Sequence, residues 1–320
     1  MSPTITICIP NFNHGKLLGQ TLDAVFSQNL DGVKVLVSDN ASSDDSLSVI
    51  DTFRHQPQLR VLRQDSTIPM ASNWNTVVKA ADTPWIIMLC SDDLLLPSAL
   101  SQLKQAAQTP DVQAIFFEYD FLVEEQRIKK TPFYQTSAMI SGQRQAEIFL
   151  KGNNYPLSAC MFKRDLLQGI GWFDESKAFC TDWHAWLKMS AAANQVLYIK
   201  EPLLLYRQHA ENETHRCVRD QVALEEVIKM KTDFISEHVI TDKDIIYGAT
   251  SNNLKLAKHY ASQMVTQGFS KAANYYLQQA SLLEQQLTTI GTKPQMSHSS
   301  APYPLPHDAA EFKSLSFCLT

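Results

Sequence analysis

Two adjacent carboxylates, Asp92 and Asp93, closely follow an apolar run at residues 85–89. Such a run is typical of a central strand of a parallel sheet, which is covered on both faces. In open α/β sheets, ligands bind just beyond the carboxyl ends of these strands. Two like charges at that place suit a bound Mg²⁺ or Mn²⁺, because both cations prefer oxygen ligands. A polar turn in front of a helix is the alternative, and the pair alone does not decide between the two.

Polar residues also follow two other runs with strand character, 4–9 and 33–37. If all three runs are strands of one parallel sheet, these residues meet the aspartate pair at one edge. There Phe12 could offer an aromatic face to a nucleotide base, the turn at Pro10 its backbone amides, and Asp39 an acceptor for an imide N–H. The alternatives are a core position for Phe12 and a turn cap for Asp39.

The elements that would position these residues alternate along the first 125 residues. We expect strands at 4–9, 33–37, 59–62, 85–89 and 114–123, and helices at 16–28, 44–53, 71–81 and 97–108. This alternation predicts an α/β fold with a Rossmann-like, mixed and mostly parallel sheet that is flanked by helices.

After this region the pattern changes twice. Residues 126–215 mix periodicities, with strand-like runs at 195–199 and 203–206. Residues 216–290 have apolar residues at helical spacing, so we expect a C-terminal helical extension of two to four helices. Residues 291–320 are rich in Ser, Pro and His, a composition that predicts a disordered tail.

Composition narrows the class of protein. The 320 residues carry a net charge of −5, which gives no general attraction to nucleic acid. Six scattered cysteines without a CxxC pair favour a reducing compartment and argue against a zinc site. Neither a secretory signal nor an apolar run of about 20 residues is present in this sequence. We therefore expect a cytoplasmic protein that contacts a membrane only peripherally, at its inner face.

Several motifs, in order, resemble family 2 glycosyltransferases of the GT-A fold. The first three are Ile9-Pro10-Asn11-Phe12-Asn13, Ser38-Asp39-Asn40-Ala41-Ser42-Ser43-Asp44 and Cys90-Ser91-Asp92-Asp93. They are joined by Asn75, by Gly171-Trp172-Phe173-Asp174-Glu175, by Thr181-Asp182-Trp183-His184-Ala185-Trp186-Leu187 and by Tyr206-Arg207-Gln208-His209. The resemblance covers roughly residues 4–215. It implies a GT-A domain at 1–215, with a nucleotide-binding half at 1–125 and an acceptor half at 126–215.

The resemblance also implies roles for single residues. Nucleotide-binding roles fall on Pro10, Phe12, Asn13, Asp39, Asn75, Asp92 and Arg207. Asp93 and His209 would bind a Mn²⁺ or Mg²⁺ cofactor, with Asp93 as the more direct ligand. On the residues alone, a surface ion pair for Arg207 and a solvated loop position for His209 are favoured.

The same resemblance implies a catalytic base. Asp182 would deprotonate the acceptor hydroxyl as it attacks the anomeric carbon, and Trp183 and Trp186 would flank the acceptor. The metal and Arg207 would stabilise the leaving nucleoside diphosphate, so a single displacement inverts the anomeric configuration. The alternative for Asp182 is an N-cap of the helix that follows it.

The chain departs from the family pattern in a few places. Cys90 stands where the family has a carboxylate, and it is a poor ligand for a hard cation. Phe12 replaces a Tyr but keeps the stacking face. The sequence has no Q-x-x-R-W motif, which argues against a processive synthase.

These observations predict an inverting glycosyltransferase that uses a nucleotide sugar, by default a UDP-sugar. The expected acceptor is a saccharide or lipid-linked saccharide in polysaccharide, O-antigen or capsule assembly. A sugar nucleotidyltransferase is the first alternative, but it would need a Gly-rich basic loop in place of residues 10–14. An inactive relative that acts as an interaction module is the second, and the joint presence of Asp39, Asp92, Asp93 and Asp182 speaks against it.

Overall fold

The computed structural model of the protein describes residues 4–208, 213–291 and 313–314. The strands are β1 (Ile5–Asn11), β2 (Val33–Asp39), β3 (Leu59–Arg63), β4 (Trp85–Met88), β5 (Leu94–Leu95), β6 (Val112–Val123), β7 (Gln126–Ile128), β8 (Ala138–Ser141), β9 (Cys160–Lys163), β10 (Gln195–Gln208) and β11 (Lys313–Ser314). The helices are α1 (Gly15–Phe26), α2 (Ser46–Thr52), α3 (Met70–Ala80), α4 (Ala99–Ala106), α5 (Gly142–Lys151), α6 (Arg164–Gly169), α7 (Thr181–Ala192), α8 (Glu213–Arg219), α9 (Val222–Glu237), α10 (Lys243–Thr266) and α11 (Ser270–Ile290), with a short 3-10 helix, η1 (Leu157–Ala159).

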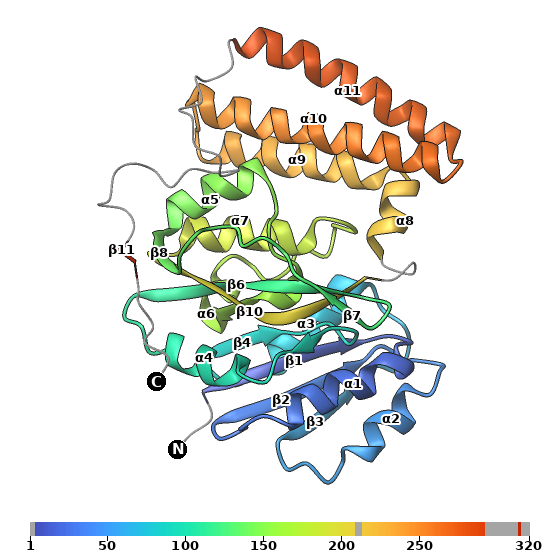
Figure 1. Cartoon of the computed structure of the whole chain (residues 1–320), viewed down its shortest axis with the longest axis vertical. Coiled ribbons are helices and arrows are strands. Elements are labelled where there is room, and N and C mark those ends of the chain that lie inside the picture. Colours follow the sequence, from blue (N-terminus) through green and yellow to red (C-terminus); the bar gives the residue numbers. More distant parts are fainter. Residues whose placement is uncertain (1–3, 209–212, 292–312, 315–320) are drawn as a thin grey trace.

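The strands form one mixed sheet in the order β11-β8-β10-β6-β9-β4-β1-β2-β3, with helices on its flanks (Figure 1). β1 runs parallel to both β2 and β4, so the ends of the first, second and fourth predicted strands do converge. The apolar runs in these strands are buried on both faces, as expected for parallel strands covered by helices. The predicted mixed sheet with flanking helices is confirmed.

The region of mixed periodicity contains an insertion that the sequence patterns did not predict. It adds β8, α5, η1, β9 and α6, and β9 lies antiparallel between β4 and β6. The two predicted runs near residues 195 and 206 are one long strand, β10. Its register against β6 shifts at Pro202, which has no N–H for the ladder. The proline separates two apolar runs in the sequence while the strand continues in space.

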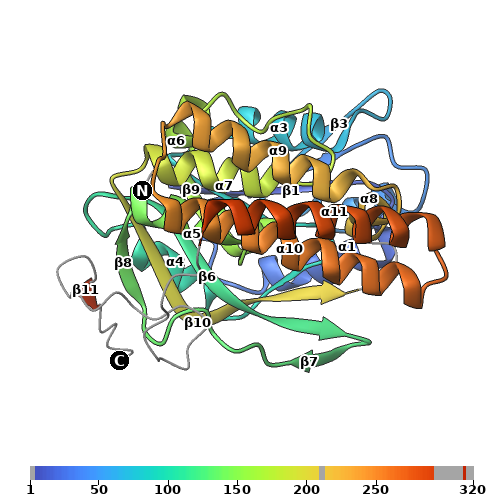
Figure 2. The same ribbon diagram turned by 90° about the horizontal axis from the view of Figure 1, so that it is seen from above.

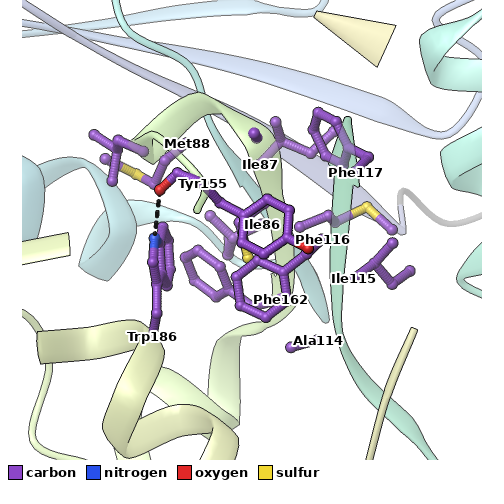
Figure 3. Packing of buried hydrophobic residues seen from close by; sticks show 14 of the residues in the cluster. Ile86, Ile87, Met88, Ala114, Ile115, Phe116, Phe117, Tyr155, Phe162 and Trp186 are labelled. Carbon is purple, nitrogen blue, oxygen red and sulfur yellow. Dashed lines mark hydrogen bonds between the residues drawn. The ribbon is translucent and has the colours of Figure 1, made fainter. Parts of the chain in front are cut away.

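Aromatic side chains fill the space between the centre of the sheet and α7. Figure 3 shows Phe116, Phe162, Tyr155 and Trp186 packed together there. The rings of Phe116 and Tyr155 stack with centroids 4.9 Å apart, and the indole of Trp186 donates to the Tyr155 carbonyl at 3.3 Å. Because Trp186 has no exposed surface, it is a core residue of this cluster.

The helices α8 to α11 form the predicted C-terminal extension, which lies on the side of α5 and α7 (Figures 1 and 2). The α9 residues Val227, Met230 and Phe234 belong to the same core cluster as the sheet. The helices α10 and α11 share a second cluster, which includes Tyr260 and Tyr276. The extension is therefore joined to the sheet region by α9.

None of the described helices combines the length and the hydropathy that a transmembrane span requires. The expectation of a disordered tail at 291–320 falls mostly outside the described residues. Of that stretch the structure describes residue 291 and β11, which pairs antiparallel with β8.

The close approach of α5 to the end of α7 depends on Gly142. A Cβ at this position would lie 1.9 Å from the Ala193 carbonyl oxygen and 2.3 Å from that of Ser190. We expect Gly142→Ala to lower the free energy of unfolding by about 2 kcal/mol or more, because backbone atoms must move apart. Denaturant unfolding of both variants provides the measurement. The control is Gly169→Ala, where a Cβ would meet nothing within 4 Å; equal losses in the two variants would contradict this account.

Candidate active site

A cavity of about 820 Å³ opens at the carboxyl ends of β1 and β4. Its wall includes Pro10 and Phe12 after β1, Asp92 after β4, and Asp182 at the start of α7. Phe12 is 45% exposed, so it is a surface residue of the cavity and not a core residue. Residues predicted from three separate motifs thus meet around one space.

The loops after β1 and β2 are tied together by a buried amide–carboxylate pair. Asn11 donates from Nδ2 to Asp39 Oδ1 at 2.9 Å, and the Ser42 N–H donates to Asp39 Oδ2 at 3.1 Å. Asp39 has no exposed surface, and it lies behind the wall formed by Asn11. The Oδ1 atom of Asn11 is buried without a hydrogen-bond partner among the described residues, and it belongs to a residue that lines the cavity. Sequence reasoning named Asn11 only for its backbone, although its place inside the Ile-Pro-Asn-Phe-Asn motif was a usable signal.

Asn13 connects the same two loops on their outer side. Its Oδ1 accepts from the Ser43 N–H at 2.8 Å, and its own N–H donates to Ser42 Oγ at 3.0 Å. Its backbone adopts a left-handed conformation with φ of 54°, which asparagine tolerates better than most residues. Asn13 therefore shapes the loop instead of facing the cavity.

Asp92 and Asp93 occupy different environments. Asp92 is partly exposed and lines the cavity, whereas Asp93 has no exposed surface. The Ser158 hydroxyl donates to Asp93 Oδ2 at 2.5 Å, and the Arg207 backbone N–H donates to Oδ1 at 2.9 Å. Burial, and then the charge of Asp92, raise the pKa of the Asp93 carboxyl well above its usual value. Of the pair, Asp92 is the carboxylate that the cavity reaches.

The two carboxylates suit a hard divalent cation better than the neighbouring thiol does. Ligand atoms of Cys90, Asp92 and Asp93 all lie within 4.8 Å of one another. Burial raises the pKa of the Cys90 thiol well above its usual value, so the sulfur stays protonated and binds such a cation poorly. The oxygen atoms fit Mn²⁺ or Mg²⁺, and a cation would offset the repulsion between the two aspartates. The predicted ligand His209 lies outside the described residues.

Arg207 is placed differently from the prediction. Its Nε donates to the Asp92 carbonyl at 2.8 Å, and its guanidinium also contacts Glu125 and Gln20. Only 5% of its surface is exposed, so it is not the surface ion-pair residue of the alternative either. Its guanidinium is held by three protein groups and does not line the cavity, so Arg207 fixes the loop after β4 instead of facing a diphosphate there.

Asp182 lies in the first turn of α7, whose N-cap position is taken by Cys180. It lines the cavity, and burial raises the pKa of its carboxyl to about 6. Hydrogen bonds from the Trp183 backbone and from the Asn153 side chain act in the opposite direction, lowering the pKa. Such a carboxyl group exchanges its proton near neutral pH, which is the property of a general base.

The structure places the two predicted tryptophans and Asn75 in different environments. Trp183 lines the cavity, and its indole donates to the Phe149 carbonyl at 2.8 Å. Trp186 lies in the core described above, so the predicted acceptor contact is not available to it. Asn75 is also buried, and it exchanges two hydrogen bonds with the Phe173 backbone, at 2.9 and 3.0 Å. It holds the loop before α7, and the predicted nucleotide contact is not available to it.

The loop before α7 is also held by Glu226 of the helical extension, a residue that the sequence patterns did not indicate. The Glu226 carboxylate on α9 accepts the backbone N–H groups of Ala178, Phe179 and Cys180 at 2.8, 2.8 and 3.2 Å. These three residues lead directly to Asp182. No local pattern marks Glu226, because its partners lie almost 50 residues earlier in the chain.

Comparisons with known proteins agree with this arrangement. The sequence model of glycosyl transferase family 2 matches residues 6–171. Glycosyltransferase GlyG of Streptococcus pneumoniae is 22% identical over 264 residues, which cover 77% of this chain and 84% of the relative. The structure is similar to S. aureus TarS 1–349 in complex with UDP-GlcNAc, with a TM-score of 0.60 and 12% identity over 90% of this chain and 92% of that one. It is also similar to mannosyltransferase PcManGT from Pyrobaculum calidifontis with GDP-Man and Mn²⁺, at a TM-score of 0.53 and 16% identity over 91% and 86% of the two chains. These likenesses confirm the predicted GT-A fold.

The contact between Asn153 and Asp182 can be tested without any substrate. Since this hydrogen bond lowers the pKa of Asp182, we expect Asn153→Ala to raise it above the value of about 6. NMR of isotope-labelled aspartate, with the signal assigned by Asp182→Asn, follows the titration. Asn154→Ala serves as the control, because its side chain donates to the Gly152 carbonyl at 3.4 Å instead. A pKa of Asp182 that is unchanged in Asn153→Ala would contradict the assignment.

Proposed function

The chain belongs to glycosyl transferase family 2, and on this basis we propose that it transfers a sugar from a nucleoside-diphosphate sugar to an acceptor hydroxyl with inversion. The observation that carries this proposal is one cavity lined by both Asp92 and Asp182. The first lies where a charged diphosphate and its cation are expected, and the second has a pKa suited to a base.

The donor end of the site is assigned to the residues after β1. The exposed ring of Phe12 supplies a stacking face for the base, and the buried Asn11 Oδ1 supplies an unpaired acceptor for a base N–H. Asp39 supports Asn11 from behind. The default donor is a UDP-sugar, which is supported by the UDP-GlcNAc bound in the TarS structure.

The leaving group is positioned by the loop after β4. Asp92 and Asp93 would hold Mn²⁺ or Mg²⁺, which would neutralise negative charge on the departing diphosphate. Ser158 and the Arg207 backbone fix the Asp93 carboxyl, and the Arg207 side chain fixes the Asp92 carbonyl. The loop is therefore preorganised before the donor arrives.

The reaction itself depends on Asp182. Its carboxylate takes the proton of the acceptor hydroxyl, while the hydroxyl oxygen attacks the anomeric carbon and the bond to the diphosphate breaks. Asn153 and the Trp183 N–H hold the carboxylate in place. One displacement from the face opposite to the leaving group inverts the anomeric configuration.

The acceptor is proposed to be a saccharide or lipid-linked saccharide of a surface polysaccharide, assembled at the cytoplasmic side of a membrane. Among the relatives, a Campylobacter jejuni enzyme named for a β-1,3-glucosyl transfer to an undecaprenol-linked acceptor is 31% identical over 108 residues. That match covers 33% of this chain and supports the acceptor class only.

Donor turnover is the direct test. With Mn²⁺ and a panel of UDP-, GDP- and dTDP-sugars, we expect wild type to release nucleoside diphosphate from one class. Asp182→Asn should lose about 1,000-fold in rate, because the amide cannot take the proton. Asp174→Asn is the control, since Asp174 precedes α7 but does not line the cavity. No turnover of any donor by wild type, or equal turnover in wild type and Asp182→Asn, would refute the proposed function.

The pH dependence follows from the pKa of about 6 for Asp182. The base acts only when deprotonated, so kcat/KM should be level above that pH and fall about tenfold per pH unit below it. Steady-state rates with the preferred donor, between about pH 5 and about pH 8, measure the profile. Rates that do not change over this interval would exclude Asp182 as the titrating base.

A further inference from the structure

One face of α10 forms part of the cavity wall. Asn252, Leu256 and Tyr260 follow one another at intervals of four residues, and all three line the cavity. That spacing places them along one side of a helix. The helix lies beside α5 on the side of the extension (Figure 1). The extension is thus part of the site, although none of its residues was predicted to take part.

Lys231 on α9 fixes the orientation of Asn252. It is buried, and its Nζ donates to Asn252 Oδ1 at 2.7 Å and to Asn253 Oδ1 at 2.8 Å. Nζ also lies 4.7 Å from the centroid of the Trp183 ring. Burial lowers the pKa of Lys231 well below its usual value, but even the neutral amine keeps two hydrogens, one for each amide oxygen. The side-chain oxygen of Asn252 therefore accepts from Lys231, and the amide nitrogen of Asn252 points in another direction.

The amide nitrogen points toward the loop that holds the base. Asn252 Nδ2 lies 3.4 Å from the position that a Cβ on Gly152 would take. The next residue, Asn153, is the one whose side chain donates to Asp182. Among the described residues, no group accepts a hydrogen bond from Asn252 Nδ2. Asn252 therefore brings to the cavity wall an oriented N–H donor that no described group uses, beside the loop that carries Asn153.

Apolar side chains line the same cavity as this donor. Leu256 is half-buried on the following turn of α10, and Phe179 is half-buried on the loop before α7. Phe179 packs edge-on against Tyr260 with centroids 6.5 Å apart, which keeps its ring in place. An N–H donor beside apolar and aromatic surface matches a sugar ring, which has hydroxyl groups at its edge and C–H groups on its face.

We propose that Asn252 is a specificity-determining residue for the acceptor: its amide N–H donates to a hydroxyl of a saccharide whose C–H face packs on Leu256 and Phe179. Lys231 is the positioning residue that holds Asn252 in this orientation. The inference rests on the proposed glycosyl transfer and assigns the acceptor side of that reaction to the helical extension.

The test uses an exchange of a single atom. Asn252→Asp keeps the size of the side chain and the bond to Lys231, but it replaces the N–H donor by an oxygen. Asn253→Asp is the matched control, because Asn253 has the same bond to Lys231 and does not line the cavity. Gly152→Ala is a second variant, which covers the Asn252 nitrogen with a methyl group and leaves α10 intact. Each protein is assayed with the preferred nucleotide sugar, Mn²⁺ and a panel of p-nitrophenyl glycosides, at about pH 8, where Asp182 is ionised.

Both transfer to the glycoside and hydrolysis of the donor are measured. We expect Asn252→Asp and Gly152→Ala to lower kcat/KM for the glycoside, and the ratio of transfer to hydrolysis, about tenfold. Asn253→Asp should keep the wild-type ratio. An unchanged ratio in Asn252→Asp, or an equal loss in Asn253→Asp, would overturn the inference. So would a wild type that hydrolyses the donor but transfers to no glycoside, whereas a wild type without any donor hydrolysis would refute the proposed function itself.

Discussion

Asp93 has a carboxyl group without solvent contact, and three distant segments must meet for it to be accommodated. Burying such a group is costly unless each oxygen accepts a hydrogen bond. The Ser158 hydroxyl supplies one bond and the Arg207 backbone the other, while Ser158 Oγ in turn accepts the Cys90 N–H at 2.9 Å. The Asp93 side chain thereby fixes three segments relative to one another: η1, the loop after β4 and the end of β10. The position of Asp92 on the cavity wall depends on this arrangement, because the Arg207 side chain holds the Asp92 carbonyl.

The second carboxyl group of the site depends on a different part of the chain. Asp182 follows a loop whose backbone N–H groups are accepted by Glu226, and Lys231 from the same helix contacts the ring of Trp183. α9 therefore holds the segment on both sides of Asp182. Since Val227 and other residues of α9 pack into the core of the sheet region, the extension cannot be considered a separate appended module. The packing of α9 against the sheet region therefore also determines the geometry of the site.

The sequence predicted those parts of the molecule whose signals are local. The apolar runs before Asp39 and Asp92 are buried on both faces, so they mark the central strands and the edge where those strands end. Which residues surround a side chain in the folded protein cannot be read from such a local pattern. Trp186 and Arg207 were assigned to ligands by motif, yet Trp186 is enclosed in the aromatic core, and each guanidinium nitrogen of Arg207 donates to an acceptor of the protein. Asn252 could not be found from the sequence, because its role depends on a lysine that approaches from another helix.

The pKa values of Asp93 and Asp182 are both raised by burial, but the consequences differ because their access to the cavity differs. Asp93 is enclosed, and its oxygens are engaged by groups of the protein, so it can fix geometry but cannot exchange a proton with a ligand. Asp182 lines the cavity, and its pKa of about 6 lets it take a proton near neutral pH and return it to solvent. Environment thus separates two chemically identical groups: Asp93 fixes the loop that would hold the cation, and Asp182 is the proton acceptor of the proposed reaction. The same reasoning applies to the amides, since Asn253 is buried against Lys231 while Asn252, with the same kind of bond, lines the cavity.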